Sequence, residues 1–176
     1  TLERPFVKYV DDKANDALAN FYGLREGYPA LRGFALFDRP AKGKSIFGDL
    51  VGHYWTKREI ENYIVDRDTL LAFAGEDRTR RNAMECAIAE AEQAAEVLER
   101  PFWSDDAKIS DDVLRPIFQN FFKRLGIRNE MPKSRYHELV AFKDPASIDP
   151  EVTEVLDKLL AAIGAWSPIG PRIRRF

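Results

Sequence analysis

The sequence has little cysteine and little histidine: one cysteine, Cys86, and two histidines in 176 residues. A single cysteine excludes a disulfide framework within the chain, and its alanine-rich surroundings indicate a small core residue rather than a nucleophile. His53 and His137 are far apart, with no second histidine at ligand spacing, which argues against a zinc site. The chain also has no run of about 18 apolar residues and no signal-peptide pattern. We therefore expect a soluble, cytoplasmic protein without a membrane partner.

Neither sign of charge is in excess, since 27 basic and 29 acidic residues leave a formal net charge of -2. No overall positive field predicts nucleic-acid binding, so an anionic partner must be held by a local patch. The length and a hydrophobic content of 45% predict one compact unit. The chain begins at Thr1 rather than at methionine, from which we expect a piece of a longer polypeptide.

Three short apolar runs in the first third of the chain predict strands. They lie in residues 5–12, 33–37 and 50–56, and a helical pattern over residues 13–24 separates the first two. The run over residues 34–37 is apolar at successive positions, which is typical of a strand buried on both faces of a parallel sheet. We expect a small parallel sheet within residues 1–66.

From residue 66 onward the periodicity is helical. Helices are predicted over residues 79–99, from about residue 115 to Gly126, over residues 134–142 and over residues 150–163. Asp149 is the predicted N-cap of the last helix, with Pro150 at its first position. The inward residues are expected to be Met84, Ile88, Ala91, Ala95 and Leu98 in the first of these helices, and Val152, Leu156, Leu159 and Ile163 in the last. The predicted fold class is α/β, with an all-helical half (67–176) packed on the sheet.

All three predicted strands end in acidic residues: Asp11 with Asp12, then Asp38, then Glu59 with Glu61. The carboxyl ends of parallel strands share one edge of a sheet, where ligands commonly bind. Carboxylates gathered there would suit Mg²⁺ or Mn²⁺, which prefer oxygen ligands. The alternative is that loops after strands are simply rich in aspartate, and that Glu59 favours the start of a helix.

The segment WTKREIENYIV, residues 55–65, closely resembles the W-x-R-R-E-I-E-N-Y-L signature that follows the Toprim (topoisomerase-primase) domain in bacterial AAA/ABC-type ATP-binding proteins. The OLD (overcoming lysogenization defect) nucleases belong to this group. YVDDKAND is similar to the turn that closes the first Toprim strand, and LRGFALFDRP to the strand that carries the D-x-D motif. SDDVLRPIFQNFF and MPKSRYHELV resemble the later helical segments, so the likeness extends from about Val7 to Leu159.

The resemblance implies a metal-binding set, which we assign to Asp11, Asp38 and Glu59, and a catalytic set, which we assign to Lys133 and Glu61. Asp11 takes the place of the family's metal-binding glutamate, Asp38 that of the first D-x-D aspartate, and Glu59 or Glu61 that of the acid after the third strand. Lys133 takes the place of the lysine that stabilises phosphate charge. Because positions i and i+2 diverge on a helix, we favour Glu59 as the metal ligand, with Glu61 as a partner of Arg58 or a backbone cap.

Two positions depart from the family pattern. Asn15 stands where the first motif has a later acid, and Pro40 stands where D-x-D has its second aspartate. Two-metal hydrolysis needs several carboxylates to clamp both cations, so the loss of these acids predicts a one-metal or inactive site.

The expected function is that of a Mg²⁺- or Mn²⁺-dependent DNA nuclease, or a remnant of one, within a homo-oligomeric ATPase. This chain itself should not bind ATP, because Asp38 stands where the G-K-S of residues 43–45 would need an upstream glycine. The alternative is a non-catalytic interaction or dimerisation domain of the same kind of ATP-binding protein, which Asn15 and Pro40 favour.

Overall fold

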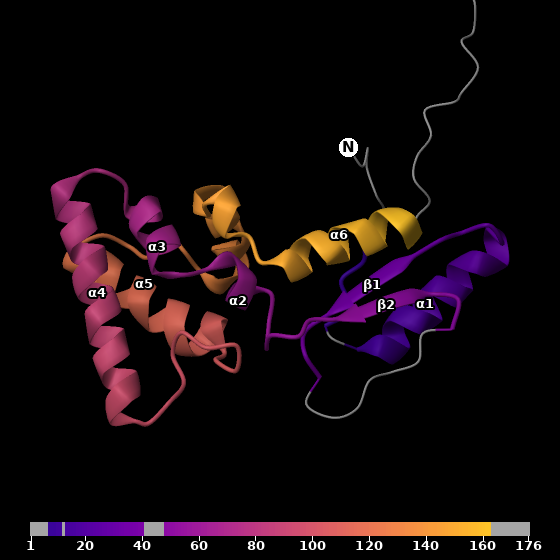
Figure 1. Ribbon diagram of the computed structural model, residues 1–176, viewed down its shortest axis with the longest axis horizontal. Coiled ribbons are helices and arrows are strands. Elements are labelled where there is room, and N and C mark those ends of the chain that lie inside the picture. Colours follow the sequence, from indigo (N-terminus) through magenta and orange to yellow (C-terminus); the bar gives the residue numbers. More distant parts are fainter. Residues whose placement is uncertain (1–6, 12, 41–47, 163–176) are drawn as a thin grey trace, which may run out of the picture.

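The computed structural model describes residues 7–11, 13–40 and 48–162 (Figure 1). The fold is mixed α/β and mostly helical, which confirms the predicted class at that level. The elements are α1 (Ala14–Gly27), β1 (Phe34–Phe37), β2 (Val51–Tyr54), α2 (Glu61–Ile64), α3 (Arg67–Ala74), α4 (Arg78–Val97), the π-helix η1 (Ile109–Leu114), α5 (Arg115–Arg124), the 3₁₀ helices η2 (Lys133–Phe142) and η3 (Pro145–Ser147), and α6 (Pro150–Ala162).

The sheet is parallel, as predicted, but the described residues form only two strands. β1 pairs with β2 in a register that joins Phe34 to Val51 and Phe37 to Tyr54. The prediction of a third strand is wrong for residues 7–10, which have no strand pairing. Val7 and Tyr9 are 62% and 88% exposed, so no buried face fixes a register for this segment. Residues 5, 6 and 12 of that predicted strand, and the G-K-S segment, lie outside the described residues.

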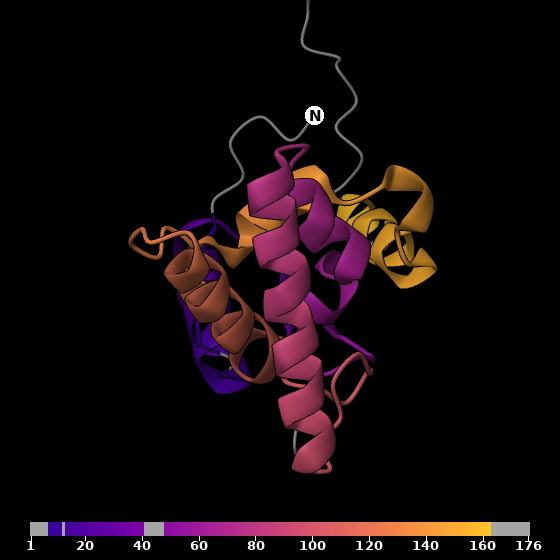
Figure 2. The same ribbon diagram turned by 90° about the vertical axis from the view of Figure 1, so that its left-hand side faces the viewer.

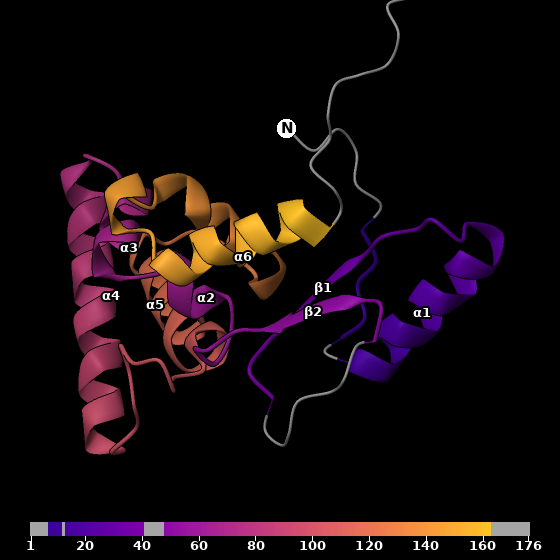
Figure 3. The same cartoon turned by 45° about the vertical axis from the view of Figure 1, so that its right-hand side comes forward.

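Gly33 allows α1 to pack closely where β1 begins. A Cβ atom at this position would lie 2.9 Å from Leu50 Cδ1 and 3.0 Å from the Phe21 ring. Both side chains are buried, so neither can give way easily. The glycine therefore sets the distance between α1 and the strands (Figure 3).

The main hydrophobic core lies in the helical half, where α4 and α5 pack side by side (Figure 2). Asp77 caps α4 by accepting a hydrogen bond from the Arg80 backbone N–H at 2.8 Å. The predicted inward stripe of this helix is confirmed except for Leu98, which follows the last helical residue and is 57% exposed. The π-helix η1 runs directly into α5, whose predicted start near Pro116 is confirmed.

Helix α6 begins at Pro150, as predicted, and lies along the strands (Figures 1 and 3). The expected inward face is wrong at Leu156, which is 52% exposed, and the predicted inward residue Ile163 lies outside the described residues. Val155 is buried instead and packs with Trp55 and Tyr63, against which Val152 and Phe34 also lie. The predicted helix over residues 134–142 is a 3₁₀ helix. Among the described residues, no helix has the length and apolar character needed to span a bilayer.

Candidate functional site

The site begins where β1 and β2 end, since their two continuations remain hydrogen-bonded to each other. The Arg39 backbone N–H donates to the Arg58 carbonyl at 3.1 Å. The Ile60 backbone N–H then donates to Asp38 Oδ1 at 3.3 Å. Asp38 is therefore held against the turn that carries Glu59 and Glu61. For these two strands, the acidic residues do lie at the same edge of the sheet, as predicted.

Glu59 is buried, with 5% of its surface exposed. Its carboxylate accepts a hydrogen bond from the backbone N–H of Ser110 and a second one, at 3.0 Å, from the Ser110 hydroxyl. Its own backbone N–H donates to Asn62 Oδ1 at 3.0 Å. Both carboxylate oxygens are thus directed at the π-helix η1. Glu59 therefore joins the end of β2 to the helical half. The sequence had predicted that its carboxylate would instead face a metal ion.

Asn62 and Arg58 hold the loop that precedes η1. Asn62 Nδ2 donates to the carbonyls of Ser104 and Ala107 at 2.9 and 3.1 Å. Arg58 Nη1 donates to the Asp106 carbonyl at 3.0 Å rather than pairing with Glu61. These two side chains of the signature therefore have structural partners.

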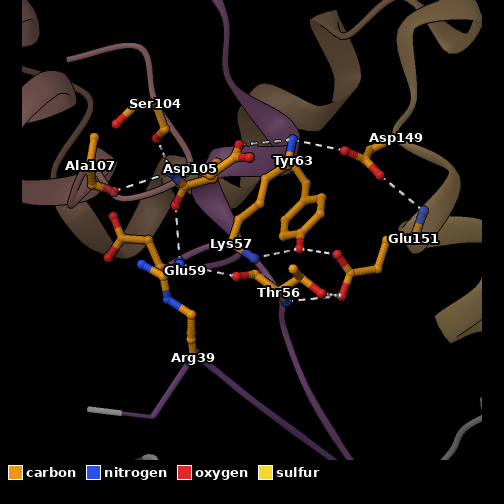
Figure 4. Close-up of polar contacts among 11 residues, drawn as sticks. Arg39, Thr56, Lys57, Glu59, Tyr63, Ser104, Asp105, Ala107, Asp149 and Glu151 are labelled. Atoms are coloured by element: carbon orange, nitrogen blue, oxygen red, sulfur yellow. Dashed lines mark hydrogen bonds and ion pairs between the residues drawn. The ribbon is translucent and has the colours of Figure 1, made fainter. Parts of the chain in front are cut away.

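Glu151, in the first turn of α6, accepts hydrogen bonds from residues of β2, of the segment after it and of α2. The Thr56 backbone N–H donates at 2.9 Å and the Thr56 hydroxyl at 3.0 Å, and the Tyr63 hydroxyl donates as well (Figure 4). His53 Nε2 lies 3.2 Å from Glu151 Oε1. Burial opposes ionisation of the Glu151 carboxyl, but these hydrogen bonds outweigh it and hold its pKa below the usual value. Burial and the bond to this carboxylate raise the pKa of Tyr63.

Lys57 is the cationic part of the same junction. Its Nζ lies 2.8 Å from Asp149 Oδ2 and 3.5 Å from Asp105 Oδ1. It also lies 4.8 Å from the centre of the Tyr63 ring, within the range of a cation–π contact. Lys57 therefore ties α6 and the loop before η1 to the end of β2 (Figure 4).

Glu61 is the carboxylate of this region whose pKa is raised. Burial, together with the negative charges of Glu59 and Asp38, raises its pKa to about 6, although a hydrogen bond from its own backbone and the positive charge of Lys133 oppose the shift. Asp38, Glu59, Glu61 and Lys133, all predicted site residues, are therefore close enough to affect one charge.

Asp11, the fifth predicted site residue, is exposed and has a left-handed φ of 45°. It lies beside a cavity of about 400 Å³. The other residues that line this cavity are Lys8, Tyr9, Val10, Asp16, Ala19 and Asn20. Asp11 is not among the charges that chiefly shift the pKa of Glu61, so its place in the metal site stays a prediction.

The carboxylates have the right chemistry for a hard cation but do not form a complete set of ligands. Among residues 7–11, 13–40 and 48–162, no group of three or more His, Cys, Asp or Glu side chains is arranged to hold a metal ion. Both oxygens of the Glu59 carboxylate are hydrogen-bonded to Ser110. The carboxylates considered as metal ligands are therefore those of Asp38 and Glu61. One or two carboxylates with water and substrate phosphate are a usual set for Mg²⁺. The residues thus fit one weakly held cation and do not fit a two-metal clamp.

Three residues of the site, Ser110, Asp111 and Glu151, were not predicted. Asp111 Oδ2 lies 3.1 Å from Lys133 Nζ. Ser110 donates to the Glu59 carboxylate, and Glu151 accepts a hydrogen bond from the Tyr63 hydroxyl. The only local signal in the sequence was the acidic pair after Ser110, Asp111 with Asp112, and it did not indicate which residues these side chains contact.

Comparison with protein-family models, with curated proteins and with solved structures finds no match to this chain. The link to Toprim-containing proteins accordingly remains a resemblance of the signature and of the segments around it.

Proposed function

We propose that this chain is the Toprim-like region of a bacterial AAA/ABC-type ATP-binding protein and that it hydrolyses DNA phosphodiesters with one Mg²⁺ or Mn²⁺. The observation that carries the proposal is the contact of Asp38 with the turn before Glu61 at the carboxyl end of a parallel sheet, where the charges of Asp38 and Lys133 both act on the Glu61 carboxyl. A sheet edge of this kind is a common ligand site. The ATPase domain of the longer protein and a second copy of the chain are the proposed partners.

Each residue has a separate part in this proposal. Asp38 and Glu61 would hold the cation, and the repulsion between their charges gives a reason for a cation to bind there. A bound cation would polarise a phosphoryl oxygen. Glu59 acts through position: anchored on Ser110, it fixes the turn from which Glu61 extends. Lys133, at the start of η2, would neutralise charge that develops on the phosphate.

A nicking assay on supercoiled plasmid DNA tests the proposal. With Mn²⁺ the chain is expected to nick the plasmid, and Asp38→Asn to lower the rate at least about tenfold, since metal Lewis acidity is worth several kcal/mol in the transition state. Asp157→Asn, an exposed change on α6, is the matched control and should nick like the wild type. Equal nicking by all three proteins would indicate a contaminant and contradict the proposal. If none nicks, the assay is repeated on the ATP-binding parent protein, where inactivity would also contradict it.

A second candidate is the non-catalytic interaction domain. The specific observation in its favour is that both oxygens of Glu59 are already hydrogen-bonded to Ser110, so the predicted third ligand is not open. In this case Asp38→Asn would leave Mn²⁺ binding and the activity of the parent protein unchanged.

A further inference from the structure

A cluster of basic side chains lies beside the candidate metal site. Asp111 Oδ2 is 2.6 Å from Lys108 Nζ and 3.1 Å from Lys133 Nζ, and Asp111 Oδ1 is 2.6 Å from Arg115 Nη2. The side chains of Lys108, Arg115 and Lys133 are 43%, 56% and 51% exposed, whereas that of Asp111 is 19% exposed. Three cations therefore converge on one recessed carboxylate and keep their outer sides in solvent.

The cluster has more positive charge than its carboxylate can neutralise. Hydrogen bonds from Lys108 and from Lys133 lower the pKa of Asp111 to about 2, so this carboxylate stays ionised. One negative charge among three positive ones leaves a surplus on a chain whose overall formal charge is -2. A local patch of this kind is what an anionic partner would need here. Lysine and arginine side chains held close together are the usual donors to phosphate oxygens.

The π-helix η1 connects this cluster to the carboxylates. Ser110 binds Glu59, and the next residue, Asp111, gathers the three cations. Single π-helical turns are rare and are often found at functional sites. Lys133 belongs to both groups, since it contacts Asp111 and also affects the charge of Glu61.

We propose that Lys108 and Arg115, positioned by Asp111, bind a backbone phosphate of the nucleic acid next to the phosphodiester held at Asp38 and Glu61. The inference rests on the proposed function for its substrate class. The chemistry is that of a phosphodiester backbone, common to DNA and RNA. Asp111 is a positioning residue in this site, because it holds the cations and does not meet the phosphate.

Fluorescence anisotropy of a short labelled single-stranded DNA, with EDTA present to prevent hydrolysis, tests this site. Wild-type protein is expected to bind with an affinity that falls as salt rises. Lys108→Gln and Arg115→Gln should each weaken binding and reduce the slope of log affinity against log salt by about 0.7. Arg81→Gln removes the same charge from α4, where Arg81 contacts Glu85 at 3.6 Å, and should leave the slope unchanged. Lys108→Arg keeps the positive charge and should also leave the slope unchanged.

Equal slopes for all these proteins, or no binding by the wild type at low salt, would overturn the inference. Labelled RNA of the same sequence is expected to respond to the variants in the same way. Polyglutamate should compete poorly, and competition equal to that of unlabelled DNA would contradict a phosphate site. The variants alter exposed ion pairs, which add little to stability, and thermal melts check that each is folded. If the protein bound DNA with the expected slopes but did not nick it, only the proposed nuclease function would be contradicted. If it nicked DNA and the variants left the slope unchanged, only the phosphate site would be contradicted.

Discussion

Replacing Glu59 by alanine is expected to lower the free energy of unfolding by about 3 kcal/mol. The change removes two hydrogen bonds to a carboxylate and leaves the Ser110 backbone N–H without its acceptor. Because Glu59 is only 5% exposed and Ser110 is fully buried, water cannot readily replace the lost partner. Urea unfolding followed by circular dichroism measures the loss.

Two variants separate the Glu59–Ser110 contact from a general effect of mutation. Glu59→Gln keeps an acceptor for the N–H and can donate to the Ser110 hydroxyl, so it should cost about 1 kcal/mol. Ser110→Ala removes only the hydroxyl contact and should cost about the same. If Glu59→Ala were as stable as the wild type but no longer bound Mn²⁺, Glu59 would be a metal ligand rather than the anchor of the turn.

Phe118→Ala is expected to destabilise the chain by about 3–5 kcal/mol. Phe118 is fully buried, with its ring centre 5.7 Å from that of Tyr136 in a stacked pair and 5.4 Å from that of Phe73. The lost ring would leave a cavity between α5, η2 and α3. The measurement is again urea unfolding, and Phe118→Leu provides a milder change that should unfold at an intermediate concentration.

Phe142→Ala is the matched control for this core position. Phe142 also meets Phe73, at 5.4 Å between ring centres, but it is 40% exposed, so its removal should cost far less. The aromatic residues of α5 could also have formed a stacking platform for bases. That function would require Phe118→Ala to weaken DNA binding while leaving unfolding unchanged, which is the opposite of the expected result.

The parts of the fold that local sequence determines were predictable. Asp149 and Pro150 mark the start of α6 because capping and a fixed φ act within one turn. The apolar run at Phe34–Phe37 forms a parallel strand, and the stripe of α4 faces the core. The resemblance of the signature and of the segments around it indicated Asp38, Glu61 and Lys133 as possible site residues, and the charges of Asp38 and Lys133 do act on Glu61.

The rest depends on partners that are distant in sequence. Leu156 has the right spacing to face inward, but α6 turns toward Trp55 and Tyr63, so Val155 is buried in its place. Glu59 was expected to face a cation, because the residue that donates hydrogen bonds to its carboxylate, Ser110, is 51 positions away and carries no local signal. The segment over residues 7–10 has a strand-like composition, but β-propensity does not supply a neighbouring strand.

Calorimetric titration with Mn²⁺ tests the central claim most directly, since ion binding requires neither the proposed ATPase partner nor a DNA substrate. The wild type should bind one ion, and Asp38→Asn and Glu61→Gln should each weaken its affinity at least about tenfold, while Asp157→Asn should not. Asp11→Asn decides whether a third carboxylate joins the site, and the arrangement described here predicts a small effect. Affinity unchanged by both Asp38→Asn and Glu61→Gln would contradict a cation site at the carboxyl end of this sheet.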